Sequence, residues 1–480
     1  MNRVSQSIMR AWVGLGSRFL PFADAATPDL PLPRLLRLSL FQVSVGVSLV
    51  LLVGTLNRVM IVELGVPASL VAIMLSLPLI FAPFRALVGF KSDTHKSELG
   101  WKRVPFIYKG TMVQFGGLAL MPFALLVLAK QGHAAEVPAW VGEVAAGIAF
   151  LLVGAGIHIT QTAGLALATD LAPEESQPKV VGLMYVSLLF GSIAAALVFG
   201  ALLSDFTPGR LIQVIQGTAV VTILLNGIAV WKQEPRSQRM ARRNAAPDPS
   251  FAESWAVFIS GHNALKRLAA VGLGTLAFAM QDVMLEPYGG QILGLGVGDT
   301  TKLTAAIAGG SLIGFSLASH ILGKGYDPFR MAAWGAITGV PAFALVMIAA
   351  PMYAPLVFGL GTLLIGFGGG LFGHGTLTAT MNSAPSEQRG LALGAWGAVQ
   401  ATAAGIGVAL GGVIRDIVIA VMPSESTATV TPYMTVYALE IVLLVVAIAV
   451  MVTLMRGTRT TTRLTNPAMP NTLPAQKEMP

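Results

Sequence analysis

Residues 38–64 read LSLFQVSVGVSLVLLVGTLNRVMIVEL, and this stretch decides the fold class because only Arg58 and Glu63 in it carry a charge. About 20 consecutive apolar residues suffice for a helix to cross the hydrocarbon core of a bilayer. Eleven comparable stretches follow along the chain. The sequence therefore predicts an all-α polytopic membrane protein with twelve transmembrane helices, at about residues 38–64, 67–90, 104–129, 138–169, 180–204, 209–231, 264–290, 300–322, 329–350, 354–380, 388–420 and 432–455.

The composition excludes several other classes of protein. The 480 residues are 54% hydrophobic and 11% charged, whereas a soluble domain has about 25% charged residues. The lack of cysteine excludes disulfides and thiolate metal sites. The sequence contains no Walker A, HExxH or GxSxG motif, so we expect no ATP hydrolysis, no proteolysis, no catalytic residue and no resident metal.

The positive charge marks membrane topology rather than nucleic-acid binding. The net charge is +8, and 25 of the 31 lysines and arginines fall in the termini, the central polar segment and alternate loops. Because lysine and arginine concentrate on the cytoplasmic side of membrane proteins, both termini are predicted to be cytoplasmic. Residues 1–37 contain five arginines and no central apolar block, so we expect no cleavable signal peptide.

Five segments follow from this topology. They are a cytoplasmic N-terminal segment (1–37), a six-helix bundle (38–231), a cytoplasmic linker (232–263), a second six-helix bundle (264–455) and a cytoplasmic tail (456–480). In the first segment, apolar residues recur every three or four positions among arginines, at Val4, Ile8, Trp12, Leu15 and Phe19. This spacing predicts a basic amphipathic helix on the cytoplasmic leaflet, with a disordered basic tail as the alternative.

Short sequences recur in the same order in the two bundles. NRVM at 57–60 aligns with QDVM at 281–284, and APEE at 172–175 aligns with APSE at 384–387. A Gly-x3-Asp loop also follows both the second and the eighth predicted helix. These matches predict two six-helix pseudo-repeats, which is the plan of major facilitator transporters.

The Gly-x3-Asp loops resemble the loop 2–3 signature of the major facilitator superfamily. A glycine there permits close helix packing, and the aspartate can accept hydrogen bonds from a helix N-terminus or pair with a basic residue. Extra residues at 94–99 depart from the usual pattern, which favours a structural latch over a gate. The signature residues are Gly89, Asp93, Gly100, Lys102 and Arg103 in the first copy and Gly323, Asp327 and Arg330 in the second.

Longer stretches resemble one branch of that superfamily. They are LPFADAATPDLPLPRLLRLSLFQVSVG (20–46), TLNRVMIVELGVPASLVA (55–72) and APFRALVGFKSDTHKSELGWKRVPFIYKG (82–110). They resemble the PucC/LhaA family, the bacteriochlorophyll-delivery branch in purple photosynthetic bacteria. The resemblance implies a twelve-helix fold without enzymatic activity and a role in assembling light-harvesting antenna complexes. It also implies a location in the bacterial inner membrane, in its intracytoplasmic photosynthetic part. It also implies bacteriochlorophyll as bound cargo and, as partners, antenna polypeptides, the reaction-centre core, bacteriochlorophyll synthase and membrane lipid.

Ionisable side chains inside the predicted helices are few, and each costs at least about 2.5–3.5 kcal/mol at mid-depth. Arg58 and Asp282 occupy equivalent positions in the two bundles and have opposite charges. We expect them to form an ion pair near the periplasmic side, either as a gate that opens when the bundles rock or as a static lock. Glu286 lies four residues after Asp282 on the same helix face, which fits either a proton-coupled carboxylate pair or an interfacial cluster.

Three further residues are candidate pigment contacts. His158 and His374 lie in the fourth and tenth predicted helices, and neutral imidazole is the natural axial ligand for a chlorophyll magnesium. Hydrogen bonding within the bundle is the alternative for both. The sequence GFGGGLFGHG at 366–375 would give either a flat surface for a ring or close helix packing. Arg85 either contacts the oxygen groups of a pigment or has a structural role, with its charge extended toward the interface.

Three functional hypotheses follow. The first is a membrane assembly factor that binds or delivers bacteriochlorophyll to antenna polypeptides, and it depends on the family resemblance. The second is a proton-coupled secondary transporter of a small solute, which the fold and the pair Asp282 and Glu286 support. The third is a non-transporting scaffold whose outer surface binds single-helix antenna subunits, and it is compatible with the first.

Overall fold

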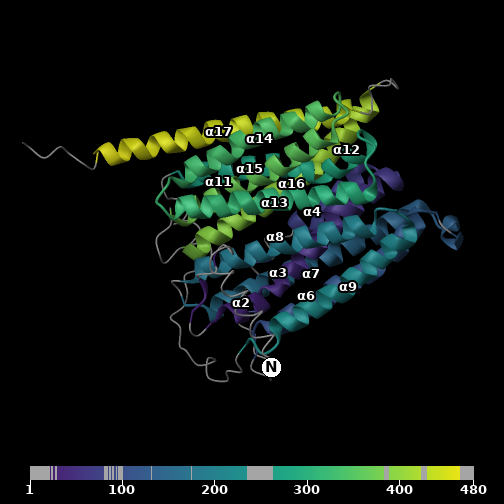
Figure 1. The fold of residues 1–480 in the computed structure, drawn as a ribbon, viewed down its shortest axis with the longest axis horizontal. Coiled ribbons are helices and arrows are strands. Elements are labelled where there is room, and N and C mark those ends of the chain that lie inside the picture. The colour runs from purple at the N-terminus through teal and green to yellow at the C-terminus, as the bar shows by residue number, and fades with distance from the viewer. Residues whose placement is uncertain are drawn as a thin grey trace, which may run out of the picture.

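A computed structural model shows an all-helical, multi-pass membrane protein, as the apolar stretches predict (Figure 1). It describes residues 22, 25–27, 30–80, 85, 88, 91–92, 95, 101–130, 132–173, 176–234, 263–382, 389–422 and 430–464. Twelve transmembrane helices can be traced in this part of the chain, and eleven of them are long and apolar enough to cross a membrane by themselves. The second is described as α4 (Ala68–Ile80), with helical residues again at 85, 88, 91 and 92.

The helices match the predicted stretches in order. The first comprises α2 (Leu32–Leu38), α3 (Leu40–Leu49), η2 (Val50–Leu56) and η3 (Val59–Glu63), and the seventh comprises α11 (Ala264–Met280), η7 (Gln281–Val283) and α12 (Leu285–Gln291). The third to sixth are α6 (Val104–Leu128), α7 (Ala139–Leu171), α8 (Gln177–Leu202) and α9 (Pro208–Val230), with a short 3₁₀ turn, η4 (Gly132–Glu136), between α6 and α7. The eighth to twelfth are α13 (Val297–Leu322), α14 (Pro328–Ala349), α15 (Pro355–Asn382), α16 (Arg389–Val421) and α17 (Thr431–Leu464).

The first and last helices are longer than expected. The first begins at Leu32, inside the predicted N-terminal segment, because Pro33 is tolerated in a first helical turn and Leu32, Leu35 and Leu38 are buried. At the other end of the chain, α17 continues to Leu464. The amphipathic helix predicted around residues 4–19, the linker residues 235–262 and the tail residues 465–480 lie outside the described residues.

Helix contacts recur in corresponding pairs within the two halves of the chain. α6 packs on α7 as α14 packs on α15, and α3 packs on α8 as α11 packs on α16. The two halves lie one above the other in Figure 1 and meet where α8 packs on α13 and α4 packs on α16. This correspondence is what two related six-helix bundles would produce, while the sequence repeat itself stays a prediction.

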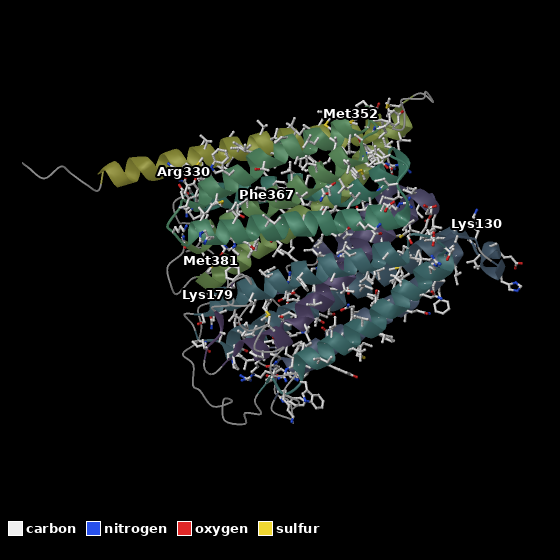
Figure 2. The ribbon with its side chains drawn as sticks, in the orientation of Figure 1. Lys130, Lys179, Arg330, Met352, Phe367 and Met381 are labelled. Carbon is white, nitrogen blue, oxygen red and sulfur yellow. The ribbon has the colours of Figure 1, made fainter. Side chains whose placement is uncertain are left out.

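The two ends of the bundle carry different loops. Lys179 and Arg330 lie at one end, called here the basic end, and Lys130 lies at the other, called here the opposite end (Figure 2). This separation agrees with the predicted alternation of loops. That the basic end faces the cytoplasm stays a prediction.

The start of the first helix, with Leu30 just before it, packs against the basic end of the first half. Leu30 and Leu35 are fully buried there against Ile107 and Leu183. Arg34 Nε donates a hydrogen bond to Gln233 Oε1 at 3.0 Å, after the sixth helix. These contacts fix the start of the first helix to the bundle.

Candidate functional site

The first and seventh helices lose regular α-helical geometry at equivalent positions. The first continues as π-helix through η2 and η3, and the seventh passes through the 3₁₀ turn η7 before α12. Irregular helix inside a membrane is tolerated where protein buries the backbone, and it frequently marks functional sites. The predicted match between NRVM at 57–60 and QDVM at 281–284 falls at these two breaks. The breaks are therefore the centre of the candidate site.

The two halves contact each other at the breaks. Asn57 Nδ2 donates to the backbone oxygen of Asp282 at 3.2 Å. The hydroxyl groups of Thr55 and Thr301 lie 3.4 Å apart, and Gly54 lies directly against Thr304. Because these residues belong to the first, seventh and eighth helices, the halves are in contact on the side of the opposite end.

The predicted ion pair between Arg58 and Asp282 is wrong. Arg58 forms an ion pair with Glu63 on its own helix, and its Nη2 donates to the backbone oxygen of Leu295 at 3.1 Å. Successive helical residues point about 100° apart, so the preceding residue, Asn57, faces Asp282 while Arg58 is directed toward the connection between α12 and α13. Arg58 still bridges the two halves, but through a backbone oxygen rather than through a carboxylate.

The two candidate carboxyl groups of the seventh helix have neutral partners. Asp282 is partly exposed and accepts a hydrogen bond from the Gln281 side chain. Glu286 is 2% exposed and accepts from Thr304 Oγ1 at 3.0 Å. A third carboxyl group, Glu440 on α17, is 0% exposed, and Asp282 lies close enough to it for their charges to interact. Sequence reasoning missed Glu440, although it is the only charged residue in the apolar stretch 432–455.

Arg85 belongs to a hydrogen-bonded network in the first half. Its Nη2 donates to Gln161 Oε1 at 2.8 Å and its Nε donates to Thr162 Oγ1 at 3.1 Å. Gln161 in turn donates to Gln42 Oε1 at 3.1 Å, which links the second, fourth and first helices. His158 lies about one turn before Gln161 on α7, and its buried Nδ1 has no hydrogen-bond partner among the described residues. The network favours the structural role of Arg85.

His374 lies in an aromatic environment in the second half. The centroid of its ring is 4.3 Å from that of Phe315 on α13 and 6.5 Å from that of Phe22, which precedes the first helix. Its Nδ1 is buried and, within the described part of the chain, makes no hydrogen bond. His374 therefore has one nitrogen without a partner and ring neighbours from both halves.

The glycine-rich stretch 366–375 packs closely against neighbouring helices at some positions and is open at others. A Cβ at Gly370 would lie 2.5 Å from the Ser311 oxygen on α13, and one at Gly368 would lie 2.7 Å from the Gly335 oxygen on α14. These glycines permit close helix packing. A Cβ at Gly369 or Gly373 would meet nothing within 4 Å, so one face of the helix beside His374 is open.

The loop signatures stabilise helix starts at the basic end. Asp327 Oδ1 accepts from the backbone N–H groups of Phe329 at 2.8 Å and Arg330 at 3.4 Å, which is the capping contact expected of the signature aspartate. Gly323 ends α13. The first copy is described only at Lys102 and Arg103, because Gly89, Asp93 and Gly100 lie outside the described residues.

In the first copy of the loop signature, an acidic residue distant in sequence accepts hydrogen bonds from the backbone N–H groups at the start of α6. Glu234, after the sixth helix, accepts from the backbone N–H groups of Lys102, Arg103 and Val104 at 2.6, 3.1 and 2.9 Å. Arg103 Nε also donates to Asp170 Oδ2 at 2.9 Å. These contacts support a structural latch at the basic end.

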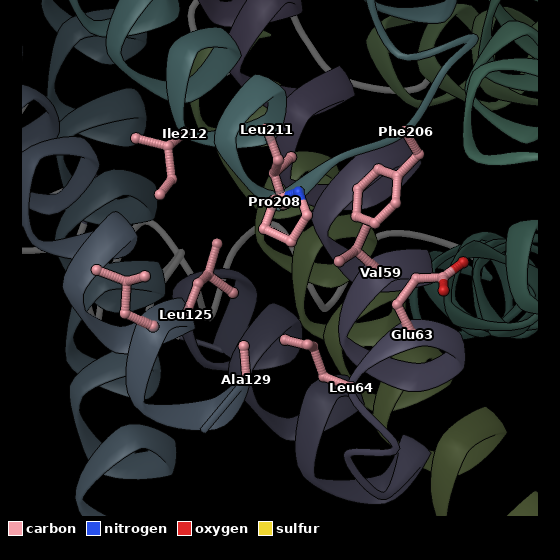
Figure 3. Close-up of a pocket in the computed structure, with 10 residues that line it drawn as sticks. Val59, Glu63, Leu64, Leu125, Ala129, Phe206, Pro208, Leu211 and Ile212 are labelled. Atoms are coloured by element: carbon pink, nitrogen blue, oxygen red, sulfur yellow. The ribbon is translucent and has the colours of Figure 1, made fainter. Parts of the chain in front are cut away.

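A cavity of about 280 Å³ lies near Glu63 between the first, third and sixth helices (Figure 3). The Glu63 carboxylate points away from the cluster of apolar side chains, toward its contact with Arg58. None of the predicted pigment or gate residues lines this cavity. Its lining is apolar apart from Glu63 and comprises Val59, Glu63, Leu64, Leu125, Leu126, Ala129, Phe206, Pro208, Leu211 and Ile212.

The architecture matches that of solved transporters. A bacterial homologue of the human lysosomal transporter Spinster, in an inward-facing and unoccupied conformation, superposes with a TM-score of 0.63 at 13% identity, covering 91% of this chain and 98% of that chain. The nucleoside transporter NupG also gives a TM-score of 0.63, at 15% identity, covering 87% and 99%. These likenesses and the broken first and seventh helices define the class, a twelve-helix membrane protein with the fold of a major facilitator transporter.

Sequence comparison gives the family. The sequence pattern of the PUCC protein family matches residues 55–459, so the chain belongs to the PucC family, as its resemblance predicted. Protein PucC of Rhodovulum sulfidophilum is 62% identical over 87% of this chain and 92% of that protein. Protein PucC of Cereibacter sphaeroides is 57% identical over 97% and 100%. A Rhodobacter capsulatus protein named bacteriochlorophyll synthase 44.5 kDa chain is 27% identical over 82% and 90%.

Proposed function

We propose that this protein is a non-enzymatic membrane assembly factor that binds bacteriochlorophyll and delivers it to light-harvesting antenna polypeptides. Membership of the PucC family is the observation that carries the proposal. The partners would be the antenna polypeptides, the reaction-centre core, bacteriochlorophyll synthase and lipid. The protein would lie in the bacterial inner membrane with both termini in the cytoplasm, as the distribution of basic residues favours.

His374 is the stronger candidate for a pigment contact. Its buried Nδ1 lacks a partner among the described residues, Phe315 lies against its ring, and the helix face at Gly369 and Gly373 is open. A neutral imidazole in this setting could donate its lone pair to the magnesium of a chlorin. His158 also has an unpartnered Nδ1, but its neighbour Arg85 is already hydrogen-bonded to Gln161 and Thr162.

The proposal is tested by purifying the protein in mild detergent from a pigment-producing cell and recording its absorption spectrum. We expect copurifying bacteriochlorophyll, and we expect His374→Ala to lower its stoichiometry or shift its absorption band. His320→Ala is the matched control, because His320 is an exposed histidine near the basic end of α13. A spectrum and stoichiometry unchanged in both His374→Ala and His158→Ala would exclude the histidine ligands, and a protein without pigment would contradict delivery.

Proton-coupled transport of a small solute is the second candidate, because the solved neighbours are transporters and the second half contains buried carboxyl groups. Reconstitution into proteoliposomes separates the two functions. Uptake of a solute driven by a proton gradient, from protein that copurifies no pigment, would favour transport. Pigment and antenna polypeptides that copurify with a protein inactive in uptake would favour assembly.

A further inference from the structure

Three carboxyl groups lie together in the second half without a basic partner. Asp282 lies close enough to both Glu286 and Glu440 for their charges to interact, and the three come from the seventh and twelfth helices. Glu286 and Glu440 are 2% and 0% exposed, while Asp282 is partly exposed. Among the described residues, no lysine, arginine or histidine forms an ion pair with any of them.

The nearest arginines are engaged elsewhere. Arg58 pairs with Glu63 and donates to the Leu295 backbone. Arg415 on α16 pairs with Asp416 and donates to Gln291 Oε1 at 3.0 Å, and its guanidinium lies 5.0 Å from the centre of the Tyr433 ring. The remaining basic residues on helices packed against α17 are at the basic end, namely Lys266, Arg267, Arg330 and, as the first residue of α16, Arg389.

Unpartnered polar atoms surround these carboxyl groups. Neither carboxyl oxygen of Glu440 has a hydrogen-bond partner within the described part of the chain. The same holds for the hydroxyl group of Tyr437, which is fully buried one turn away and close enough to Glu440 for charge interaction. The side-chain oxygens of Gln281 and Asn57, whose amide groups donate to Asp282, are also without partners.

The other phenol groups nearby are satisfied. Tyr288 donates to the Val346 backbone oxygen at 3.0 Å, and Tyr433 donates to Gln291 Oε1 at 2.7 Å. The Tyr288 ring packs with both of the others, at centroid distances of 5.5 Å to Tyr437 and 5.4 Å to Tyr433. The surroundings of Glu440 therefore supply no positive charge to balance a carboxylate, and the Tyr437 hydroxyl is the one nearby phenol group, among the described residues, that is left without a partner.

An isolated ionised carboxylate in such surroundings is far more costly than the neutral acid, and burial without a partner is resolved by protonation. We propose that Glu440, Glu286 and Asp282 form a proton-binding site in the second half, in which Glu440 and Glu286 hold protons and the partly exposed Asp282 connects them to the surroundings. A protonated carboxyl group carries an O–H donor, and the unpartnered oxygens around the site are acceptors that can receive it.

A proton fits this site better than a metal ion. No three carboxylate or imidazole groups among the described residues are arranged to hold a metal ion. The site also adjoins the contact between the halves, because Thr304 donates to Glu286 and lies against Gly54, and Asn57 donates to the Asp282 backbone. Loss of the protons would place negative charge at that contact, so proton occupancy would favour the contact between the halves seen here.

Infrared difference spectroscopy of the full chain in lipid nanodiscs tests the proposal. We expect the C=O stretching band of protonated carboxylic acid at neutral pH, a shift of this band in D₂O, and its reversible loss at alkaline pH. Glu440→Gln should remove one component of the band. Asp205→Asn is the matched control, because Asp205 is an exposed carboxylate whose replacement should leave the band unchanged.

Each contrary outcome would overturn the site. These are absence of the band at neutral pH, a band unaffected by Glu440→Gln, loss of the band only on unfolding, or a titration that depends on sodium rather than choline as the salt cation. Should Glu440→Gln fail to fold, Glu286→Gln carries the same test, since it removes the other carboxyl group that holds a proton in the proposed site. Pigment binding is not involved in any of these readouts, so the result is independent of the proposed function.

Discussion

The breaks in the first and seventh helices lie at equivalent positions but differ in the partners of their ionisable side chains. In the first helix, Arg58 is balanced by Glu63 and by the Leu295 backbone oxygen. In the seventh, Asp282 and Glu286 accept only from neutral side chains, and Glu440 has no partner within the described residues. A balanced buried charge fixes a structure, whereas a buried acid without a cation can change its charge by taking up or releasing a proton. We therefore infer a static contact at the first break and a titratable site at the second.

We expect the largest effect from a substitution that disturbs the packing of α15 on α13 in the second half. In Gly370→Leu the new side chain would collide with the Ser311 backbone of α13. Overpacking usually costs about 1–3 kcal/mol, and a collision with backbone should cost more, so we expect loss of monodisperse protein. Fluorescence-detected size-exclusion chromatography and thermal melting in detergent measure this loss.

The neighbouring Gly369 provides the matched control. A side chain there meets nothing within 4 Å, so Gly369→Leu should yield folded protein with a melting temperature close to that of the wild type. Equal behaviour of the two variants would mean that α13 and α15 do not pack as described.

The twelve helices were predictable because each needs only a long apolar stretch, and a bilayer imposes that requirement on every span. The recurring NRVM and QDVM indicated equivalent positions in the two halves, but the irregular helix at these positions was not predicted. The partner of Arg58 could not be predicted from the sequence. Two carboxylates, Glu63 and Asp282, were available, and successive helical residues point about 100° apart, so the exact direction of the Arg58 side chain decides between them. Glu440 carried a signal in its apolar stretch, but its proximity to Asp282 depends on how the twelfth helix packs on the seventh.

A charge exchange tests the static contact at the first break. Arg58→Glu would place two carboxylates together and leave the Leu295 oxygen without its donor. Loss of one partner of a fully buried ion pair costs about 3–5 kcal/mol, and because the Glu63 side chain is 36% exposed we expect about 2–3 kcal/mol here. Combination with Glu63→Arg should restore most of the melting temperature in a double-mutant cycle.

The same exchange with the other carboxyl group distinguishes the two possible partners. Arg58→Asp combined with Asp282→Arg should not restore stability, since the Asp282 side chain accepts from Gln281 and no ion pair links it to Arg58. If Arg58→Asp with Asp282→Arg restored stability and Arg58→Glu with Glu63→Arg did not, Arg58 would pair with Asp282, and the two breaks would no longer differ.

The smallest expected effect compares the starts of the third and ninth helices. Asp327, at the cap position of α14, accepts hydrogen bonds from two backbone N–H groups at the start of that helix. Glu234, which follows the sixth helix, accepts hydrogen bonds from three backbone N–H groups at the start of α6. Removal of a capping side chain costs about 1 kcal/mol, so we expect about 1 kcal/mol for Asp327→Ala and about 2 kcal/mol for Glu234→Ala. Glu234→Gln, which keeps an acceptor oxygen, should lie between Glu234→Ala and the wild type in thermal melting. A larger loss in Asp327→Ala than in Glu234→Ala would show that the local cap of the second half matters more than the long-range latch of the first.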